Sequence, residues 1–167
     1  MRLKLLPSVL ILAAGCAAAP PVQSHFIHTA NLFPADGFIT QRAVFSTHGR
    51  QFPLNGYLAV SETGGKRLVI TENFGHILAD VLVKPGGKVF VMQSSRAFSP
   101  KDIRLGVAAD LQCVFGDATN LNCPVEMPDA NHFIIKRHGY SLDLRIVEVK
   151  PGAQPASLFD ESKAERQ

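Results

Sequence analysis

The sequence lacks the short motifs that mark the common enzyme classes. It has no Gly-x-Ser-x-Gly nucleophile elbow, no phosphate-binding loop and no zinc signature. Glu72 and Asp80 are isolated carboxylates, which we interpret as surface charges rather than as an acid/base pair. We therefore expect a protein that is not an enzyme and that needs no cofactor.

A strong charge of one sign is also lacking. The chain has 17 Lys and Arg residues against 14 Asp and Glu residues, so we expect no nucleic-acid partner. The histidines do not gather at metal-ligand spacing. His25 and His28 have no accompanying carboxylate or cysteine, and His48 and His138 each stand beside a glycine at an expected turn. We therefore expect no metal site.

Long apolar runs are absent apart from one near the N-terminus, and that run is too short to span a bilayer as a helix. Residues 5–14 are largely apolar and follow the basic Arg2 and Lys4, which is the pattern of a secretory signal. The letters LAAGC that end at Cys16 are similar to the lipobox of bacterial lipoproteins. We expect residues 1–15 to be a signal peptide and Cys16 to be acylated. The alternative is an ordinary secretory signal that leaves Cys16 as a free thiol.

Residues 16–36 predict an acylated tether that leads into the folded domain, because they contain several prolines and no periodic pattern. Ala17 stands where lipoproteins retained in the inner membrane carry an Asp. By this resemblance we expect a lipid-anchored protein on the periplasmic face of the outer membrane. The acyl anchor would be its only firm attachment to the membrane.

Cysteine is scarce in the rest of the chain, where only Cys113 and Cys123 occur. In an exported protein an even pair predicts a disulfide. Closing a loop of this size would stabilise the fold by about 2–3 kcal/mol. Two buried or free thiols are the alternative.

Short strand patterns joined by glycine-bearing turns follow one another from residue 37 on. No helices are interleaved among the first five, which disfavours a parallel sheet and predicts a meander of antiparallel neighbours. We expect one domain over residues 37–150, a loop over 117–131 and a polar, frayed tail over 151–167. The predicted strands cover residues 37–47, 51–62, 66–71, 77–84, 88–93, 133–137 and 140–150.

One helix is predicted after the meander. Ser99 is a natural N-cap, Pro100 suits the first helical position, and Asp102 completes a capping box. Gly116 suits the end of the helix. Cys113 lies away from the apolar face of this helix and can reach the loop that holds Cys123. The apolar face consists of Ile103, Val107, Leu111 and Val114.

The central strands are apolar on both faces, so both faces need a cover. The helix could cover one face, and the other could be covered or could form the wall of an apolar cavity in a curved, partly open barrel. A closed sandwich with a dry core is the alternative. The turn Pro85-Gly86-Gly87 would pair Val83 with Val89 and Val81 with Val91. The expected cavity residues are Val69, Ile77, Ala79, Val81, Val83, Val89, Val91, Val107 and Leu111.

The turn after the third predicted strand carries a Phe at its tip, where polar residues are usual. This Phe belongs to the segment LVITENFGH (68–76). A predicted strand follows, and then the segment PGGKV (85–89). The predicted helix ends at the segment GDAT (116–119). Over about residues 42–120, with a weaker match in the last hairpin, this order resembles the lipoprotein carrier and receptor proteins of the Lol pathway, the LolB-like proteins. The chain is shorter than those proteins and has no clear amphipathic helix before its first strand.

The resemblance implies a mainly β fold, in which a curved antiparallel sheet forms an incomplete barrel with a helical lid and holds acyl chains. It implies that Phe74 and Gly75 form a membrane-insertion loop, since an exposed Phe can enter the acyl boundary of a bilayer. The alternative is that Phe74 folds back and closes the core. Expected partners are acyl chains or lipoproteins and a periplasmic LolA-like carrier, with the protein a monomer. A second hypothesis is an envelope assembly module that docks through its sheet edge without a ligand.

Overall fold

The computed structural model of the chain describes residues 32–116 and 123–164. The predicted signal peptide, the acylation of Cys16 and most of the predicted tether therefore lie outside the described residues. Among the described residues, no helix has both the length and the apolar character needed to cross a membrane.

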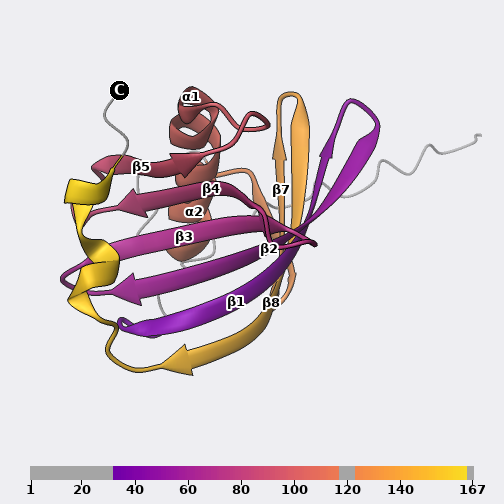
Figure 1. Cartoon of the computed structure of the whole chain (residues 1–167). Coiled ribbons are helices and arrows are strands. Elements are labelled where there is room, and N and C mark those ends of the chain that lie inside the picture. Colours follow the sequence, from indigo (N-terminus) through magenta and orange to yellow (C-terminus); the bar gives the residue numbers. More distant parts are fainter. Residues whose placement is uncertain (1–31, 117–122, 165–167) are drawn as a thin grey trace, which may run out of the picture.

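Eight antiparallel strands form one strongly curved sheet, which Figure 1 shows as an unclosed barrel. The strand order is β5-β4-β3-β2-β1-β8-β7-β6, so the first five strands form the predicted meander and β8 returns to pair with β1. This confirms the predicted mainly β fold with an inserted helix. The strands are β1 (Gly37–Thr47), β2 (Arg50–Ser61), β3 (Gly65–Glu72), β4 (Ile77–Val83), β5 (Val89–Ser94), β6 (Val125–Asp129), β7 (His132–Arg137) and β8 (Tyr140–Pro151).

The hairpin between β4 and β5 has the predicted register. Val83 pairs with Val89 and Val81 pairs with Val91. Gly86 and Gly87 both have positive φ, at 86° and 87°, a conformation that side chains with a Cβ rarely adopt. The local sequence therefore specifies both the turn and the pairing that follows from it.

The helix also begins where the sequence predicts. It consists of α1 (Pro100–Asp102), a π-helical segment η2 (Ile103–Val107) and α2 (Ala108–Phe115). Ser99 and Asp102 form the capping box: the Asp102 amide donates to the Ser99 hydroxyl and the Ser99 amide donates to the Asp102 carboxylate, each over 3.2 Å. Gly116 is the C-cap, as predicted.

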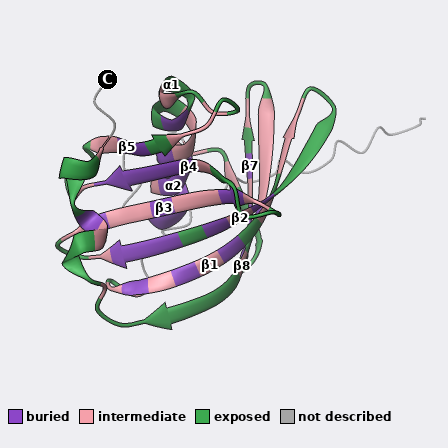
Figure 2. Cartoon of the chain, in the orientation of Figure 1, coloured by how far each residue is buried: buried purple, intermediate pink, exposed green. Residues whose placement is uncertain are grey.

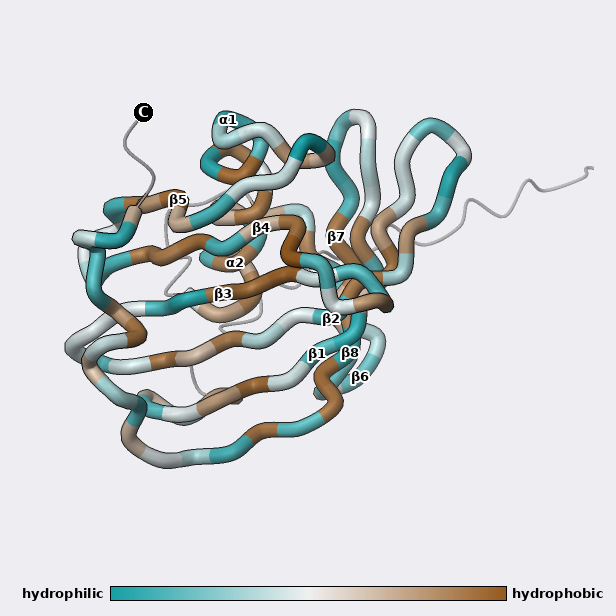
Figure 3. The backbone as a smooth tube through the Cα atoms, in the orientation of Figure 1, coloured by the Kyte–Doolittle hydropathy of each residue, from teal (hydrophilic) through white to brown (hydrophobic). Residues whose placement is uncertain are grey.

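The helix packs on the concave face of the sheet and forms the main core with it. Figure 2 shows buried residues concentrated along the middle strands and the helix, and exposed residues at the hairpin tips. Figure 3 shows the corresponding alternation of hydrophobic and hydrophilic residues along the strands. The most deeply buried members of this core are Ile39, Leu58, Ala79, Val81, Val91, Ile103, Ala108, Val114, Phe133 and Ile135.

The expected loop over residues 117–131 is wrong in part, because residues 125–129 form strand β6. This strand pairs with β7, with Val125 opposite Ile135 and Glu126 opposite Ile134. Pro128 and the acidic residues hide the strand in the sequence. Its neighbour supplies the hydrogen-bonding partners that keep it extended.

The prediction of a frayed C-terminal tail is also wrong for the described residues. Two short 3-10 helices, η3 (Ala156–Phe159) and η4 (Glu161–Lys163), lie beside β3 and β5, and Figure 1 shows them in yellow. Phe159 is only 4% exposed. It covers the apolar patch that the convex face of the sheet presents, which consists of Ala59, Leu82 and Met92.

The interpretation of Asp80 as a surface charge is wrong as well. Asp80 is 5% exposed and lies on the convex face, where Arg67 binds both of its carboxylate oxygens. The two hydrogen bonds are 3.0 and 2.7 Å long. Arg67 also donates to the carbonyl of Leu158, and Lys84 donates to the carbonyl of Phe159. These two cations hold the C-terminal segment against the sheet.

Candidate functional site

A cavity of about 990 Å³ lies between the concave face of the sheet and the helix. It is partly open to solvent. Its volume is at the upper end of the range of roughly 300–1,000 Å³ that is usual for ligand pockets. The apolar side chains that line it are Ala43, Phe45, Leu54, Leu68, Ile70, Ala97, Phe98, Leu105, Val107, Leu111, Val114, Phe115, Pro124, Ile135, Leu142 and Leu144.

Most of the residues that the sequence predicts to line the cavity do not line it. Val107 and Leu111 line it as predicted. Val69 shares a face of β3 with Arg67, which bonds to Asp80 on the convex side, so its assignment to the cavity is wrong. Ile77 begins β4 and is 36% exposed, outside the cavity lining. The remaining predicted residues face the helix and pack into or against the core instead: Ala79, Val81, Val83, Val89 and Val91.

The physical reason is the path of the helix, which fills the concave face over β4 and β5. The hollow remains over β1, β2, β3, β7 and β8, and of these strands only β3 held a predicted cavity residue, Val69. The alternation of Leu142 and Leu144 with polar residues along β8 was the available signal. It shows that β8 has one apolar face but not that this face borders a hollow.

A cluster of aromatic side chains contributes to the cavity wall through Phe45, Phe98 and Tyr140, and Phe52 packs beside Phe45. The Phe45 ring is 5.3 Å from the Tyr140 ring, 5.7 Å from the Phe98 ring and 6.4 Å from the Phe52 ring, measured between centroids. Leu105, on the π-helical segment η2, lines the same cavity and is nevertheless mostly exposed. Irregular helical turns of this kind are frequent at functional sites. Apolar side chains from both the sheet and the helix therefore contribute to the cavity wall.

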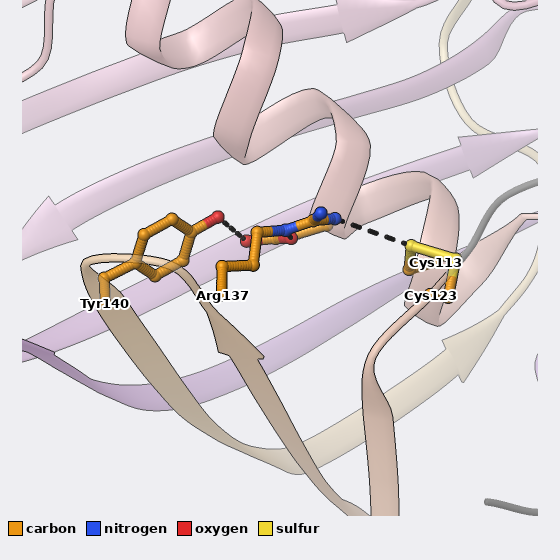
Figure 4. A network of polar contacts seen from close by, with 5 residues as sticks. Cys113, Cys123, Arg137 and Tyr140 are labelled. Atoms are coloured by element: carbon orange, nitrogen blue, oxygen red, sulfur yellow. Dashed lines mark hydrogen bonds and ion pairs between the residues drawn. A yellow bond between two sulfur atoms is a disulfide. The ribbon is translucent and has the colours of Figure 1, made fainter.

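A polar network joins the helix to the β7–β8 hairpin at the cavity wall (Figure 4). Asp110 on α2 accepts a hydrogen bond of 2.7 Å from the Tyr140 hydroxyl and one of 2.6 Å from Nε of Arg137. A second guanidinium nitrogen of Arg137 lies 3.8 Å from Sγ of Cys113. Cys113 forms the predicted disulfide with Cys123. The network and the disulfide thus fix the same end of the helix.

Burial controls the protonation of this network. Burial raises the pKa of Asp110, against the opposing effect of the hydrogen bonds from Tyr140 and Arg137 and of the Arg137 charge. Burial also raises the pKa of Tyr140, and the hydrogen bond to Asp110 raises it further. Although burial disfavours its charged form, the hydrogen bond and charge of Asp110 raise the pKa of Arg137. Tyr140 therefore stays a neutral hydrogen-bond donor at neutral pH.

A single buried amide interrupts the apolar floor of the cavity. Gln41 on β1 lines the cavity and is 3% exposed. Its Oε1 has no hydrogen-bond partner among the residues that the structure describes. A buried acceptor without a partner costs about 1–3 kcal/mol. Sequence reasoning missed Gln41, because one polar residue in a strand usually points to solvent.

The turn between β3 and β4 carries Phe74 outward. The Gly75 amide donates to the carbonyl of Glu72 over 2.9 Å, and Gly75 has a φ of 83°. Phe74 is 88% exposed, so the alternative that it folds back over the core is wrong. The turn lies at the same end of the barrel as the β1–β2 and β7–β8 hairpins, since β1, β3 and β7 all run toward that end. Thr47, His48, His138 and Gly139 of those two hairpins line the cavity, so the cavity extends to this end.

No protein-family model matches the sequence, and no curated protein matches it either. Within residues 32–116 and 123–164, no group of three or more His, Cys, Asp or Glu side chains could hold a metal ion.

Proposed function

We propose that this protein binds acyl chains or other long apolar groups in its cavity and helps to insert lipid or lipoprotein into the outer membrane. The observation that carries the proposal is the apolar cavity of about 990 Å³ between the curved sheet and the helix. Long hydrocarbon chains need a continuous apolar wall more than they need polar partners. Apolar side chains make up most of the cavity wall, and several polar and charged side chains from the β7–β8 hairpin line it as well, among them Lys136, Arg137 and His138.

The position of Phe74 supports the membrane part of the proposal. A large apolar side chain that is 88% exposed at the tip of a turn has little to contribute to the core. It can enter the acyl boundary of a bilayer. Because the turn lies at the same end as the hairpin residues that line the cavity, contact of Phe74 with a membrane would bring the cavity close to the lipid surface.

The N-terminal segment supports the location. Acylation of Cys16 would tether the domain to a membrane. A protein with this anchor, a half-open barrel and an exposed apolar turn would act in the manner of a LolB-like receptor, taking an acylated cargo from a periplasmic LolA-like carrier.

The binding step can be tested by extracting the purified full-length protein with organic solvent and identifying released molecules by mass spectrometry. We expect acyl-bearing molecules to accompany the wild-type protein and to be depleted in Ala43→Phe, which fills the cavity. Val44→Phe is the matched control, because Val44 is the next residue of β1, lies outside the cavity lining and is exposed.

The proposal fails if the wild-type protein is free of lipid and also binds no added fluorescent fatty acid. That result would favour the docking hypothesis, in which the protein assembles with a partner through its sheet edge. Equal loss of lipid in both variants, with both still folded, would also contradict a cavity-based function.

A further inference from the structure

Gln41 lies at the centre of the concave face, on the floor of the cavity. In the sheet it is directly opposite Gly56 on β2 and opposite Ile146 on β8. Ile39 and Ala43 flank it on the same face of β1, and both belong to the apolar core or pack against it. The amide is therefore a polar group set within an apolar surface.

Gly56 makes the space that this amide occupies. A Cβ added at Gly56 would lie 2.5 Å from both Cγ and Nε2 of Gln41. Gly56 has no positive φ, so its backbone does not require glycine. The requirement is spatial: the absence of a side chain at position 56 allows Gln41 to lie across the neighbouring strand.

The Oε1 atom of Gln41 is buried and has no hydrogen-bond donor within the described part of the chain. Buried polar atoms almost always have a partner, since losing water without replacing it is costly. The apolar side chains around Gln41 cannot donate a hydrogen bond. Oε1 has almost no accessible surface in this arrangement, so a donor in the cavity that Gln41 lines reaches it once the amide turns toward the cavity.

We propose that Gln41 recognises a hydrogen-bond donor carried by the bound chain, so that the cavity selects hydroxylated or amide-linked acyl groups over plain hydrocarbon chains. This inference rests on the proposed acyl binding and specifies its ligand class. The apolar side chains of the cavity wall supply contact along the chain. Gln41 accepts a hydrogen bond from an O–H or N–H group on that chain.

The test compares three probes with the same chain length: methyl myristate, methyl beta-hydroxymyristate and N-methylmyristamide. Their affinities are measured by calorimetry on the full-length protein, with Gln41→Leu as the variant. We expect the wild type to bind one or both donor-bearing probes roughly three- to tenfold more tightly than methyl myristate, as one added hydrogen bond allows. Comparing the hydroxyl probe with the amide probe shows whether the cavity prefers a hydroxylated or an amide-linked acyl group.

In Gln41→Leu the preference should disappear, while methyl myristate binds at least as well as it does to the wild type. Gly56→Ala is a second test that leaves the amide itself unchanged. The added methyl group displaces Gln41 and should reduce the preference for the donor-bearing probes. Thermal unfolding of each variant establishes that it is folded. If Gln41→Leu does not fold, the probe preference of the wild type and its reduction in Gly56→Ala test the role of Gln41.

Equal binding of all three probes by the wild type would overturn this inference and leave the proposed acyl binding intact. Persistence of the preference in folded Gln41→Leu would overturn it too. Failure of the wild type to bind any probe would instead contradict the proposed function itself.

Discussion

The hydroxyl of Tyr140 donates a hydrogen bond of 2.7 Å to the carboxylate of Asp110. This contact joins β8 to helix α2 across the cavity wall, and Arg137 binds the other oxygen of the same carboxylate. The only buried charge on α2 is thus matched by two donors from one hairpin, within the described residues. The position of the helix over the sheet depends on this match as well as on apolar packing.

The first prediction concerns the ionisation of Tyr140. Burial, and then the hydrogen bond to Asp110, raise the pKa of Tyr140 above its ordinary value of 10.0. In Tyr57→Phe, Tyr140 is the sole tyrosine, so ultraviolet absorbance reports its ionisation alone. We expect the absorbance change to occur well above pH 10. Adding Asp110→Asn should move it down, because the carboxylate no longer opposes the phenolate.

The sign of the stability effect follows from the same shift. Because the folded-state pKa of Tyr140 is raised, its contribution to stability is fully present below the unfolded value of 10.0. It is lost as the pH rises toward the folded value. Ionisation of Tyr140 at its ordinary pH in the folded protein would contradict the buried hydrogen bond.

The second prediction concerns the disulfide between Cys113 and Cys123. The two cysteines are 10 residues apart, and opening a loop of this size should lower the free energy of unfolding by about 2–3 kcal/mol. Urea denaturation of the double variant Cys113→Ser/Cys123→Ser measures this loss. A reducing agent should lower the midpoint of the wild type and leave that of the variant unchanged. An equal midpoint for both proteins would show that the bond contributes no stability.

The third prediction concerns the C-terminal segment. Phe159→Ala should lower the free energy of unfolding by about 3 kcal/mol, because it opens a void over the convex face. Ser157→Ala, at an exposed position of the same 3-10 helix, is the control and should have little effect. Urea denaturation of both variants gives the comparison. Similar small effects from the two substitutions would mean that the segment does not cover the sheet in solution.

The fourth prediction concerns the ion pair of Arg67 and Asp80. Arg67→Met should lower the free energy of unfolding by about 3 kcal/mol, because it leaves the buried Asp80 without its partner. The double variant Arg67→Met/Asp80→Asn should lose less than the two single variants together, since no unpaired charge remains. A double-mutant cycle measures the coupling. Strict additivity would argue against a direct interaction.

The fifth prediction concerns Phe74. Phe74→Glu should leave the thermal midpoint unchanged, because the side chain is exposed, and should reduce binding to liposomes and delivery of an acylated cargo to them. Val147→Glu is the matched control, since Val147 is also an exposed apolar residue but lies on β8, away from the turn. A loss of stability without a loss of delivery would assign Phe74 a structural role.

Much of the fold follows from local signals in the sequence. The capping box of Ser99 and Asp102 begins the helix, the two glycines after Pro85 make the tight reversal, and the cysteine pair forms a bridge. Each signal acts through the backbone preferences of a few neighbouring residues, or through a periodicity that holds along one strand. These preferences are nearly the same in any fold, so the sequence alone is enough to read them.

The candidate site depended much more on tertiary structure. Periodicity shows that Val81 and Leu142 each lie on an apolar face, but only the path of the helix decides that one is core and the other borders the cavity. A carboxylate such as Asp80 looks like a surface charge until strand pairing brings Arg67 to it. Gln41 shows the same difference, since its burial is set by Gly56 and Ile146, which are distant in sequence.

By itself, therefore, the sequence determined the strands, the turns, the helix and its cap, and the apolar character of each face. The tertiary structure decided which part of the concave face is filled, what covers the convex face and which polar groups are paired or left without a partner. The reason is physical: backbone conformation is governed by near neighbours, whereas burial and hydrogen-bond satisfaction depend on atoms that only the folded chain brings together.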